Sequence, residues 1–535
     1  MNKLSIVLLL TMLTTHAQGQ PARNPTPWIP DLGNGSYKNP VLFADYSDPD
    51  VVRVGSDFYL TSSSFSMVPG LPVLQSRDLV NWKIVGHAID RMPARFDTPQ
   101  SGNGIWAPSI RYHDGWYWIF VGDPDWGILM VKTKDPAGNW EPIHVVQEGK
   151  GLIDTCPLWD DDGKAYLVHA FAGSRAGRRD IIVVNEMSPD GTKLVGEEHL
   201  VIDGRNDVYR TIEGPKFYKR NGWYYIFAPA GGVTGGYQLV ARSKNVFGPY
   251  EVKKVLEQGA SEVNGPHQGA WITTPAGEDW FMHFQDRGGY GRIVHLQPMR
   301  WVDDWPMMGF DKDGNGIGEP VPVFNKPNVG MQYPSDVPQT SDEFNGAQIG
   351  LQWQWTANPR AEWASLIARP GFLRMKATPK VPYLTNVPSQ LLQKFPAPKF
   401  MATTRMEVSA DGAGTQAGLV VMGPSYAAIT VSRGGDGLVV QRITSNPPGR
   451  GGATTRPDEP SASANVPAGP VWLRVSVETE ARCTFSYSTD GESFKPLGEA
   501  FPARGAAGTW MGSRIGLFCI GDGGYADFDW FRIEG

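Results

Sequence analysis

Three acidic residues, Asp48, Asp154 and Glu213, lie at similar places along the sequence, each close to the start of a short apolar segment. Glu213 is followed by a Gly-Pro pair and by two aromatic segments that Asn221 and Gly222 separate. Asn-Gly between alternating apolar runs is a strong β-hairpin signal, so we expect Glu213 at the mouth of a hairpin. A single Glu beside a turn is most often a solvated surface charge. Repetition of the pattern along the chain favours a functional interpretation instead.

Paired carboxyl groups of this kind can cleave a glycosidic bond with water. An acid gives a proton to the leaving oxygen, while a carboxylate base activates water on the opposite face of the sugar. In the inverting arrangement the two groups stand roughly 6.5–9.5 Å apart, which leaves room for the water. A third carboxylate helps because its charge keeps the acid protonated near neutral pH. Spacing alone does not decide which of the three residues has which role.

The elements that would position these residues form a repeat of five units. A turn followed by an aromatic-rich strand recurs, with the aligned aromatic residues at Tyr59, Trp118, Tyr166, Tyr225 and Phe281. The steps are 59, 48, 59 and 56 residues, which suits a four-stranded blade with long loops. The sequence therefore predicts a five-bladed β-propeller over residues 20–319. We expect it to close around 292–301, by pairing with a strand near the mature N-terminus.

A shorter strand precedes each aromatic strand. We expect the functional site at the N-terminal end, or head, of these shorter strands. The first strand of each propeller blade lines the central channel, so the residues at the five heads should converge there. If these were ordinary solvated turns, Lys, Ser and Asn would be as frequent as acidic residues. The five head residues are instead Asp48, Trp106, Asp154, Glu213 and His267. Trp106 and Phe65 are candidate sugar-binding residues, and Arg292 and His267 could hold hydroxyl groups or a cation.

The composition agrees with an all-β chain of more than one domain. The 535 residues exceed one ordinary core, and 63 Gly, 44 Pro and only 19% charged residues favour short strands and tight turns. The formal net charge of −6 argues against nucleic acid or an anionic membrane as a partner, because such partners bind basic surfaces.

The N-terminal residues 1–19 have the pattern of a secretory signal. Lys3 precedes the apolar run 4–13, and small residues near Ala17 and Gly19 offer a cleavage site. This run is too short to span a bilayer, and no later stretch is apolar over the ~18 residues that a span requires. We therefore expect a soluble protein that is secreted or periplasmic.

Three cysteines, Cys156, Cys483 and Cys519, are too few for a disulfide framework. Cys483 and Cys519 could pair across a sheet in an oxidising compartment. Buried free thiols are the favoured interpretation, because Cys packs well as a small apolar residue.

Residues 311–316 resemble the first half of a calcium loop, but Pro322 stands at its twelfth position, so an ordinary polar turn is favoured. Residues 320–340 contain five Pro and are predicted to be a linker.

Alternating apolar runs over 341–535 predict an antiparallel β-sandwich. Within it, 446–464 is expected to be a long mobile hairpin loop. The sandwich also contains three carboxylates that either share a bound cation or lie separately on the surface. They are Asp342, Asp527 and Asp529.

Four stretches resemble glycoside hydrolase family 43, and the resemblance covers nearly all of the mature chain. They are Ser47–Val54, Ile153–Gly163, Glu213–Lys219 and Gly291–Pro298. The tail between Ser341 and Phe531 is similar to the concanavalin A-like sandwich that many members described as β-xylosidases and α-L-arabinofuranosidases carry.

This resemblance assigns a role to each acidic residue: Asp48 matches the general base, Asp154 the residue that orients the acid and raises its pKa, and Glu213 the general acid. It implies no cofactor for the chemistry, and a structural calcium ion in the channel that His267 would hold. Gln268 and Gly269 depart from the small-residue pattern of that cation site. Some galactan-cleaving relatives lack the base, which is present here.

The leading hypothesis is an exported, inverting exo-glycosidase that removes terminal xylose or arabinose from hemicellulose oligosaccharides. The sandwich would turn the channel into a pocket, with residues 381–390 as the segment that reaches the site. The alternatives are a non-catalytic carbohydrate-binding propeller, a galactan- or arabinan-cleaving relative, and, less favoured, a propeller lyase or sulfatase-like enzyme. The sequence does not choose between xylose and arabinose and does not give the oligomeric state.

Overall fold

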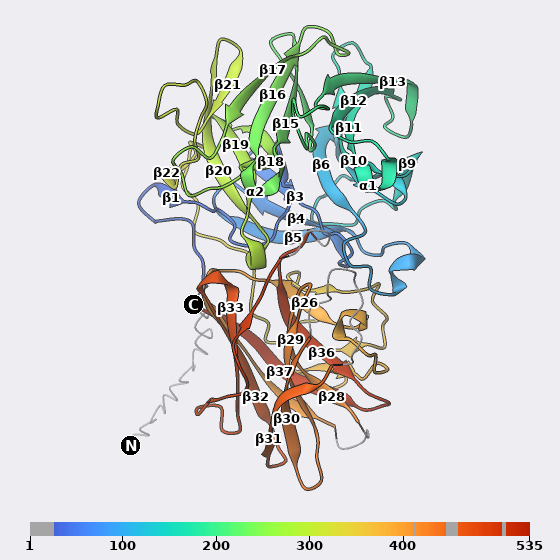
Figure 1. Ribbon diagram of the computed structural model, residues 1–535, viewed down its shortest axis with the longest axis vertical. Coiled ribbons are helices and arrows are strands. Elements are labelled where there is room, and N and C mark those ends of the chain that lie inside the picture. Colours follow the sequence, from blue (N-terminus) through green and yellow to red (C-terminus); the bar gives the residue numbers. More distant parts are fainter. Residues whose placement is uncertain (1–25, 410–413, 446–457, 506–509) are drawn as a thin grey trace, which may run out of the picture.

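The computed structural model shows an all-β chain with two domains, one above the other in Figure 1. It describes residues 26–409, 414–445, 458–505 and 510–535. The predicted signal at 1–19 lies outside the described residues. Strands coloured blue to yellow-green form a five-bladed β-propeller, and strands coloured orange to red form a β-sandwich. The predicted fold class is confirmed.

Each propeller blade is a four-stranded antiparallel sheet whose strands follow one another in chain order. The hairpin signal found five times in the sequence therefore occurs once per blade, between its first and second strands. The blades are β2 (Asp50–Val54), β3 (Asp57–Thr61), β4 (Gly70–Ser76), β5 (Trp82–Ile89); β6 (Trp106–His113), β7 (Trp116–Asp123), β8 (Gly127–Thr133), β9 (His144–Glu148); β10 (Leu152–Trp159), β11 (Ala165–Phe171), β12 (Ile181–Met187), β13 (Leu194–Asp203); β14 (Lys216–Arg220), β15 (Trp223–Ala230), β16 (Tyr237–Ser243), β17 (Glu251–Leu256); and β18 (His267–Thr273), β19 (Asp279–Asp286), β20 (Arg292–Val302), β21 (Trp305–Met308).

The first strands of the blades lie around the propeller axis: β2 contacts β6 and β18, and β10 contacts β6 and β14. At the head of every first strand one residue has a positive φ, in the left-handed region that residues other than Gly rarely adopt. The five are Asp48 (56°), Ala107 (48°), Asp154 (59°), Gly214 (61°) and Gln268 (38°). All five blades thus start with the same backbone turn.

The propeller closes where the sequence predicts. Leu42 and Val294 of β20 exchange two backbone hydrogen bonds, of 3.2 and 3.0 Å, between the N-terminal segment and blade 5. Farther out, β1 (Ser36–Lys38) pairs with β22 (Val323–Asn325). Because β22 lies within 320–340, that segment contains a short strand that binds back to the propeller.

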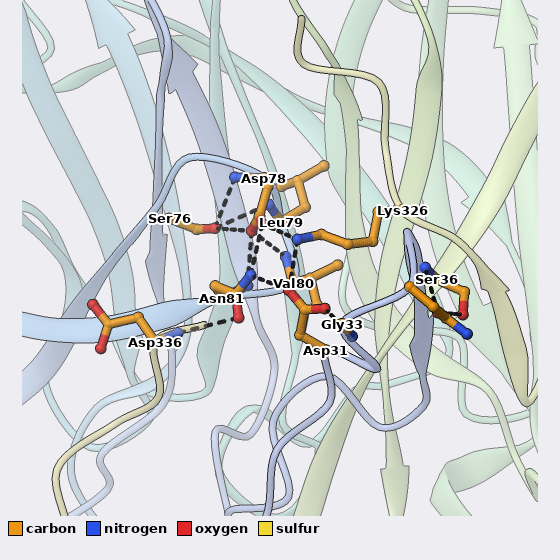
Figure 2. A network of polar contacts seen from close by, with 11 residues as sticks. Asp31, Gly33, Ser36, Ser76, Asp78, Leu79, Val80, Asn81, Lys326 and Asp336 are labelled. Atoms are coloured by element: carbon orange, nitrogen blue, oxygen red, sulfur yellow. Dashed lines mark hydrogen bonds and ion pairs between the residues drawn. The ribbon is translucent and has the colours of Figure 1, made fainter. Parts of the chain in front are cut away.

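A polar network fixes both of these outer segments to blade 1 (Figure 2). Lys326 Nζ lies 2.7 Å from carboxylate oxygens of both Asp31 and Asp78, and its side chain is only 14% exposed. Asn81 Nδ2 donates to the same two carboxylates, at 2.8 and 2.7 Å. The network joins the segment before β1, the turn between β4 and β5, and the segment after β22.

Two antiparallel sheets form the sandwich, and an apolar core that includes Leu419, Leu473 and Phe528 lies between them. In spatial order, one sheet consists of β23 (Gln354–Trp355), β26 (Leu391–Lys394), β36 (Arg514–Ile520), β28 (Gln416–Met422), β29 (Ala427–Arg433), β30 (Leu438–Thr444) and β31 (Pro460–Val466). The other consists of β24 (Ala364–Ser365), β25 (Leu373–Lys376), β37 (Tyr525–Glu534), β27 (Phe400–Val408), β32 (Val471–Glu478), β33 (Arg482–Ser488) and β34 (Lys495–Pro496), with β35 (Phe501–Pro502) also on β33.

The cysteines are free and buried, as the favoured interpretation has it. Cys483 lies on β33 and Cys519 on β36, so the two thiols belong to different sheets.

Part of the predicted 446–464 loop is wrong, because residues 460–464 belong to β31 and pair with β30. Residues 446–457 lie outside the described residues.

The carboxylates of the sandwich do not gather: Arg374 binds Asp527 through two hydrogen bonds of 2.7 and 2.8 Å, whereas Asp342 accepts the indole N–H of Trp353 at 3.0 Å. In the 311–316 turn, Asp311 accepts the amide protons of Gly314 and Gly316, as in an ordinary polar turn.

Helices are short in the described part of the chain, and none is long and apolar enough to cross a membrane. They comprise α1 (Gly173–Ala176), α2 (Gly232–Gly235), and the 3-10 turns η1 (Ala94–Asp97), η2 (Gly288–Tyr290), η3 (Leu384–Asn386) and η4 (Thr479–Ala481).

Candidate active site

The five head residues come together at the channel, but they occupy two positions rather than one. Asp48 and Asp154 are themselves the left-handed residues of their blades. Glu213, Trp106 and His267 each come one residue earlier, directly before Gly214, Ala107 and Gln268. The sequence alignment that placed all five in one position is wrong by one residue, because hairpin signals do not reveal a local φ.

Solvent access differs from blade to blade at the earlier position: Trp106 and Glu213 are partly exposed, whereas Ile153 and His267 are 5% and 1% exposed. Trp106, Glu213 and the equivalent residue of blade 3, Ile153, line one pocket, whereas Asp48 and Asp154 are 4% and 5% exposed. Gly214 suits the left-handed position of blade 4, where φ is 61° and a Cβ would lie 2.6 Å from Cδ of Gln268. Its amide donates to Asp154 of the neighbouring blade.

Hydrogen-bond donors surround Asp48. Arg292 Nη1 lies 3.0 Å from Asp48 Oδ1, and the hydroxyls of Ser47 and Ser63 donate to Oδ2 at 2.9 and 2.5 Å. The Ser63 hydroxyl in turn accepts the amide of Ala107 at 2.7 Å, which fixes its orientation. Both oxygens of Asp48 thus accept hydrogen bonds, the arrangement expected of a base that takes a proton from water.

Asp154 and Glu213 form a coupled pair across neighbouring blades. The Gly214 amide donates to Asp154 Oδ2 at 2.7 Å. In the described part of the chain the Glu213 carboxyl has one ion-pair contact, with His267 Nε2 at 3.7 Å, which is too long for a hydrogen bond. When the two carboxyl groups hold one proton between them, Glu213 is the one that carries it, because the amide hydrogen bond stabilises the charged form of Asp154.

The pKa shifts agree with a protonated Glu213 beside a charged Asp154. The pKa of Glu213 is raised to about 8, first because burial disfavours its charged form and second because the charge of Asp154 lies close. Burial also raises the pKa of Asp154, which the Gly214 hydrogen bond opposes. The Glu213 side chain is 37% exposed because it faces the pocket, so a bound sugar would displace water and favour the protonated form further. Glu213 is thereby suited to give a proton at neutral pH.

His267 has a neutral ring with unpartnered nitrogens, but the oxygen ligands of a calcium site are not gathered around it in the described chain. Its side chain is 1% exposed, neither ring nitrogen has a hydrogen-bond partner among the described residues, and burial lowers its pKa to about 3, so the ring is neutral. Calcium prefers six to eight oxygen ligands. The described residues hold no group of three or more His, Cys, Asp or Glu side chains that could bind a metal ion. One neutral imidazole does not supply the oxygen ligands that a calcium ion requires from the protein.

The pocket in front of Glu213 has a volume of about 1150 Å³, above the range of about 300–1,000 Å³ typical of small-molecule sites. Trp106 lies on one side of it, with an indole N–H that has no hydrogen-bond partner in the described chain. Phe65, the other predicted sugar-binding residue, is 2% exposed and lies behind Trp106, with ring centroids 6.5 Å apart. Phe65 therefore supports Trp106 and offers little free surface of its own.

A residue of the sandwich domain also lines this pocket, but it is not in 381–390. Trp510 lies on the pocket wall, 38% exposed, with its ring 5.8 Å from the Arg292 guanidinium carbon. Asp45 holds the two regions together, because its oxygens accept the amides of Arg292 and Gly512, each at 3.0 Å. No sequence signal marks Trp510, since its place depends on how the domains pack.

Segment 381–390 contains η3, and Thr385 lies beside a separate, small cavity between the domains. The expectation that this segment reaches the acidic site is therefore wrong: Thr385 and the rest of 381–390 do not line the pocket that holds Glu213. The residues together can perform acid–base hydrolysis, with a proton donor at the pocket and a hydrogen-bonded carboxylate behind it.

Comparison with known proteins agrees with this chemistry. Residues 37–306 match the family model for glycosyl hydrolases family 43, and residues 341–534 match the model for the beta xylosidase C-terminal concanavalin A-like domain. A protein of Xylanibacter ruminicola named "Putative beta-xylosidase" is 40% identical over 493 residues, which cover 91% of this chain and 86% of that protein.

Two further similarities extend over nearly the full length. A non-reducing end alpha-L-arabinofuranosidase of Bacteroides ovatus is 30% identical and covers 94% of this chain and 96% of its own. The crystal structure of a family 43 protein mutant from Bacillus licheniformis superposes with a TM-score of 0.80 at 26% identity, over 94% of this chain and 100% of that one.

Proposed function

The chain belongs to glycosyl hydrolases family 43, and from this premise we propose that it is an inverting exo-glycosidase that removes terminal pentosyl residues from hemicellulose oligosaccharides. A glycoside hydrolase acts on a carbohydrate substrate, and no redox cofactor enters the reaction. The observation that carries the proposal is the pair of opposed roles at the channel. Glu213 keeps a proton, and Asp48 is held by Arg292 and two hydroxyls.

In the proposed reaction, water attacks the anomeric carbon from the side opposite the leaving group. Asp48 takes the proton of this water as the new C–O bond forms, while Glu213 gives its proton to the leaving oxygen as the old bond breaks. Burial, and after it the charge of Asp154, keeps Glu213 protonated until that moment. One attack on the anomeric carbon inverts its configuration. Proton NMR of the first-formed sugar measures this, and net retention would refute the inverting mechanism.

A Glu213→Ala variant tests the acid role. Natural xylosides have poor leaving groups, so their kcat/KM is expected to fall by about 10²–10⁴-fold without the proton donor. Activated aryl glycosides leave without a proton and should lose far less. Equal losses on both substrates would contradict the assignment, and so would a variant with unchanged activity on xylobiose.

The sugar specificity we propose is β-D-xylosidase first and α-L-arabinofuranosidase second. Support for the first comes from the 40%-identical relative and from a 34%-identical relative in Formosa agariphila named beta-xylosidase. The second has the Bacteroides ovatus relative in its favour. A panel of aryl β-xyloside and aryl α-arabinofuranoside, together with arabinoxylan and arabinan oligosaccharides, ranks the two. Higher kcat/KM on the arabinofuranosides would reverse the order.

We place the enzyme outside the cytoplasm and give it exo action. The export proposal rests on the signal pattern of 1–19. Exo action is supported by Trp510, which adds a wall from the sandwich domain to the channel mouth. N-terminal sequencing of the protein from the culture medium or periplasm tests the first point. The time course of xylohexaose hydrolysis tests the second, because xylose and xylopentaose are the only first products expected of exo action.

A further inference from the structure

The outer part of the pocket is rich in arginine. Beyond Trp106, Ile153 and Glu213, most of its lining comes from blade 3, namely the β11–β12 connection, β13 and the loop that follows β13. Four guanidinium groups line this part, against the carboxylates of Asp180 and Glu198; they belong to Arg175, Arg178, Arg179 and Arg205. Each of the four contacts one carboxylate, so what distinguishes them is how many donors that contact leaves free.

This arginine-lined wall lies on the side of the leaving group. The amide of Thr211, two residues before Glu213, donates to Asp180 Oδ1 at 2.9 Å, so the turn that carries Arg179 is fixed beside the acid. An acid catalyst must contact the leaving oxygen. The part of the substrate that departs therefore extends from Glu213 toward blade 3, and the volume of about 1150 Å³ has room for more than one sugar.

The four arginines differ in how far their donors are already used. Arg178 binds both oxygens of Glu198, at 2.7 and 2.8 Å, and Arg205 binds both oxygens of Asp203, at 2.8 and 2.6 Å. Arg175 contacts Asp125 Oδ1 through Nε at 3.4 Å, donates to Ser174 and Asn103, and lies over the Trp106 ring.

Arg179 keeps its terminal donors free. Its ion pair joins Nε to Asp180 Oδ2 at 3.4 Å, and neither Nη1 nor Nη2 has a hydrogen-bond partner within the described ranges. The side chain is 63% exposed, yet its stem packs on Gly173, where a Cβ would lie 3.1 Å from Arg179 Cδ. The two free amino groups form a planar fork, which matches a carboxylate in a bidentate pair.

We propose that this wall is a subsite for a uronic acid, a sugar with a carboxylate, carried on the leaving part of the substrate, and that Arg179 is its specificity-determining residue. The inference rests on the proposed function, because it assigns the leaving side from the role of Glu213. A neutral oligosaccharide makes no ion pair with Arg179, so the subsite distinguishes acid-decorated from plain chains.

Binding of a reaction product tests the subsite without any turnover. The probe is a disaccharide of glucuronic acid linked to O2 of xylose, and its control is the methyl ester of the same disaccharide, which has nearly the same shape and no charge. In calorimetry at low salt, the wild-type protein should bind the acid about tenfold more tightly than the ester. Arg179→Gln should reduce this ratio to about twofold or less, with the affinity for the ester unchanged.

Arg300→Gln is the matched control, because Arg300 is an exposed arginine on β20 outside the pocket. It should keep the tenfold ratio. A wild-type ratio near one, or a ratio that Arg179→Gln leaves unchanged, would overturn the inference. Hydrolysis of neutral xylobiose in the same preparation checks the proposed function separately: its failure would count against the pentosidase, while the ratio of dissociation constants still decides the subsite.

Discussion

Replacement of Asp154 by Asn tests how the acid keeps its proton. Asn has nearly the shape of Asp and its side-chain oxygen can still accept the 2.7 Å hydrogen bond from the Gly214 amide, but it carries no charge. The pKa of Glu213 is raised from 4.5 to about 8, with burial as the largest cause and the charge of Asp154 as the next. The variant should therefore lower this pKa without returning it to 4.5.

The size and sign of the effect follow from these causes. A like charge in contact typically contributes about one unit or more to a carboxyl pKa, and one unit corresponds to about 1.36 kcal/mol. We expect the pKa of Glu213 to fall by about one unit. Glu213 acts in its protonated form, so activity is lost as pH rises through its pKa. The alkaline limb of the kcat/KM profile should consequently move about one unit toward lower pH.

The assay is kcat/KM for xylobiose between about pH 5 and about pH 10. An aryl xyloside with an activated leaving group should show no such alkaline limb, because it needs no proton from Glu213. Asp180→Asn is the matched control: Asp180 also raises the pKa of Glu213, but as the weakest of the contributing charges, so the limb should move less. An alkaline limb that stays in place in Asp154→Asn, or moves upward, would refute the reasoning.

Three further variants test other parts of the structure. Arg292→Met removes the 3.0 Å ion pair of Asp48, so kcat/KM should fall about 100-fold on natural and activated substrates alike; a loss confined to natural substrates would point to the acid instead. Trp510→Ala should raise KM about tenfold with little change in kcat or in the thermal midpoint, since the ring lines the pocket and makes no hydrogen bond to a carboxylate in the described chain; a kcat effect alone would contradict this. Lys326→Met leaves two partly buried carboxylates without their cation and should lower the free energy of unfolding by about 3 kcal/mol in denaturant titrations; an unchanged midpoint would show that the network in Figure 2 adds no stability.

The propeller and its acidic residues could be predicted because their signals are local. Each blade repeats a turn and an aromatic strand within about ten residues, and Asp48, Asp154 and Glu213 stand 11, 12 and 12 residues before the aligned aromatic residues. The one-residue error at the heads has a physical cause. A backbone turn with positive φ at Ala107 or Gln268 leaves no trace in residue type, because neither residue is a usual choice for that conformation.

The pocket walls could not be predicted in the same way. Trp510 reaches the site through the packing of one domain on the other, and Asp45 joins the two through backbone amides that any residue could supply. Arg179 stands in a run that looks like any polar turn until Thr211 is found beside Asp180. The hydrogen bond from Thr211 to Asp180 joins residues 31 positions apart, and the one from Gly512 to Asp45 joins residues 467 positions apart. Contacts over such separations leave no local pattern in a single sequence.

The five left-handed turns at the blade heads have a mechanical consequence. Acid, base and their charged neighbour all stand on the propeller's inner ring, so the geometry of bond breaking is set by the angle from one blade to the next. The wall that holds Trp510 belongs to the other domain and touches this ring through Asp45. Mutations that weaken the contact between the two domains can therefore change which sugars bind in the pocket, while the three acidic residues keep their relative positions.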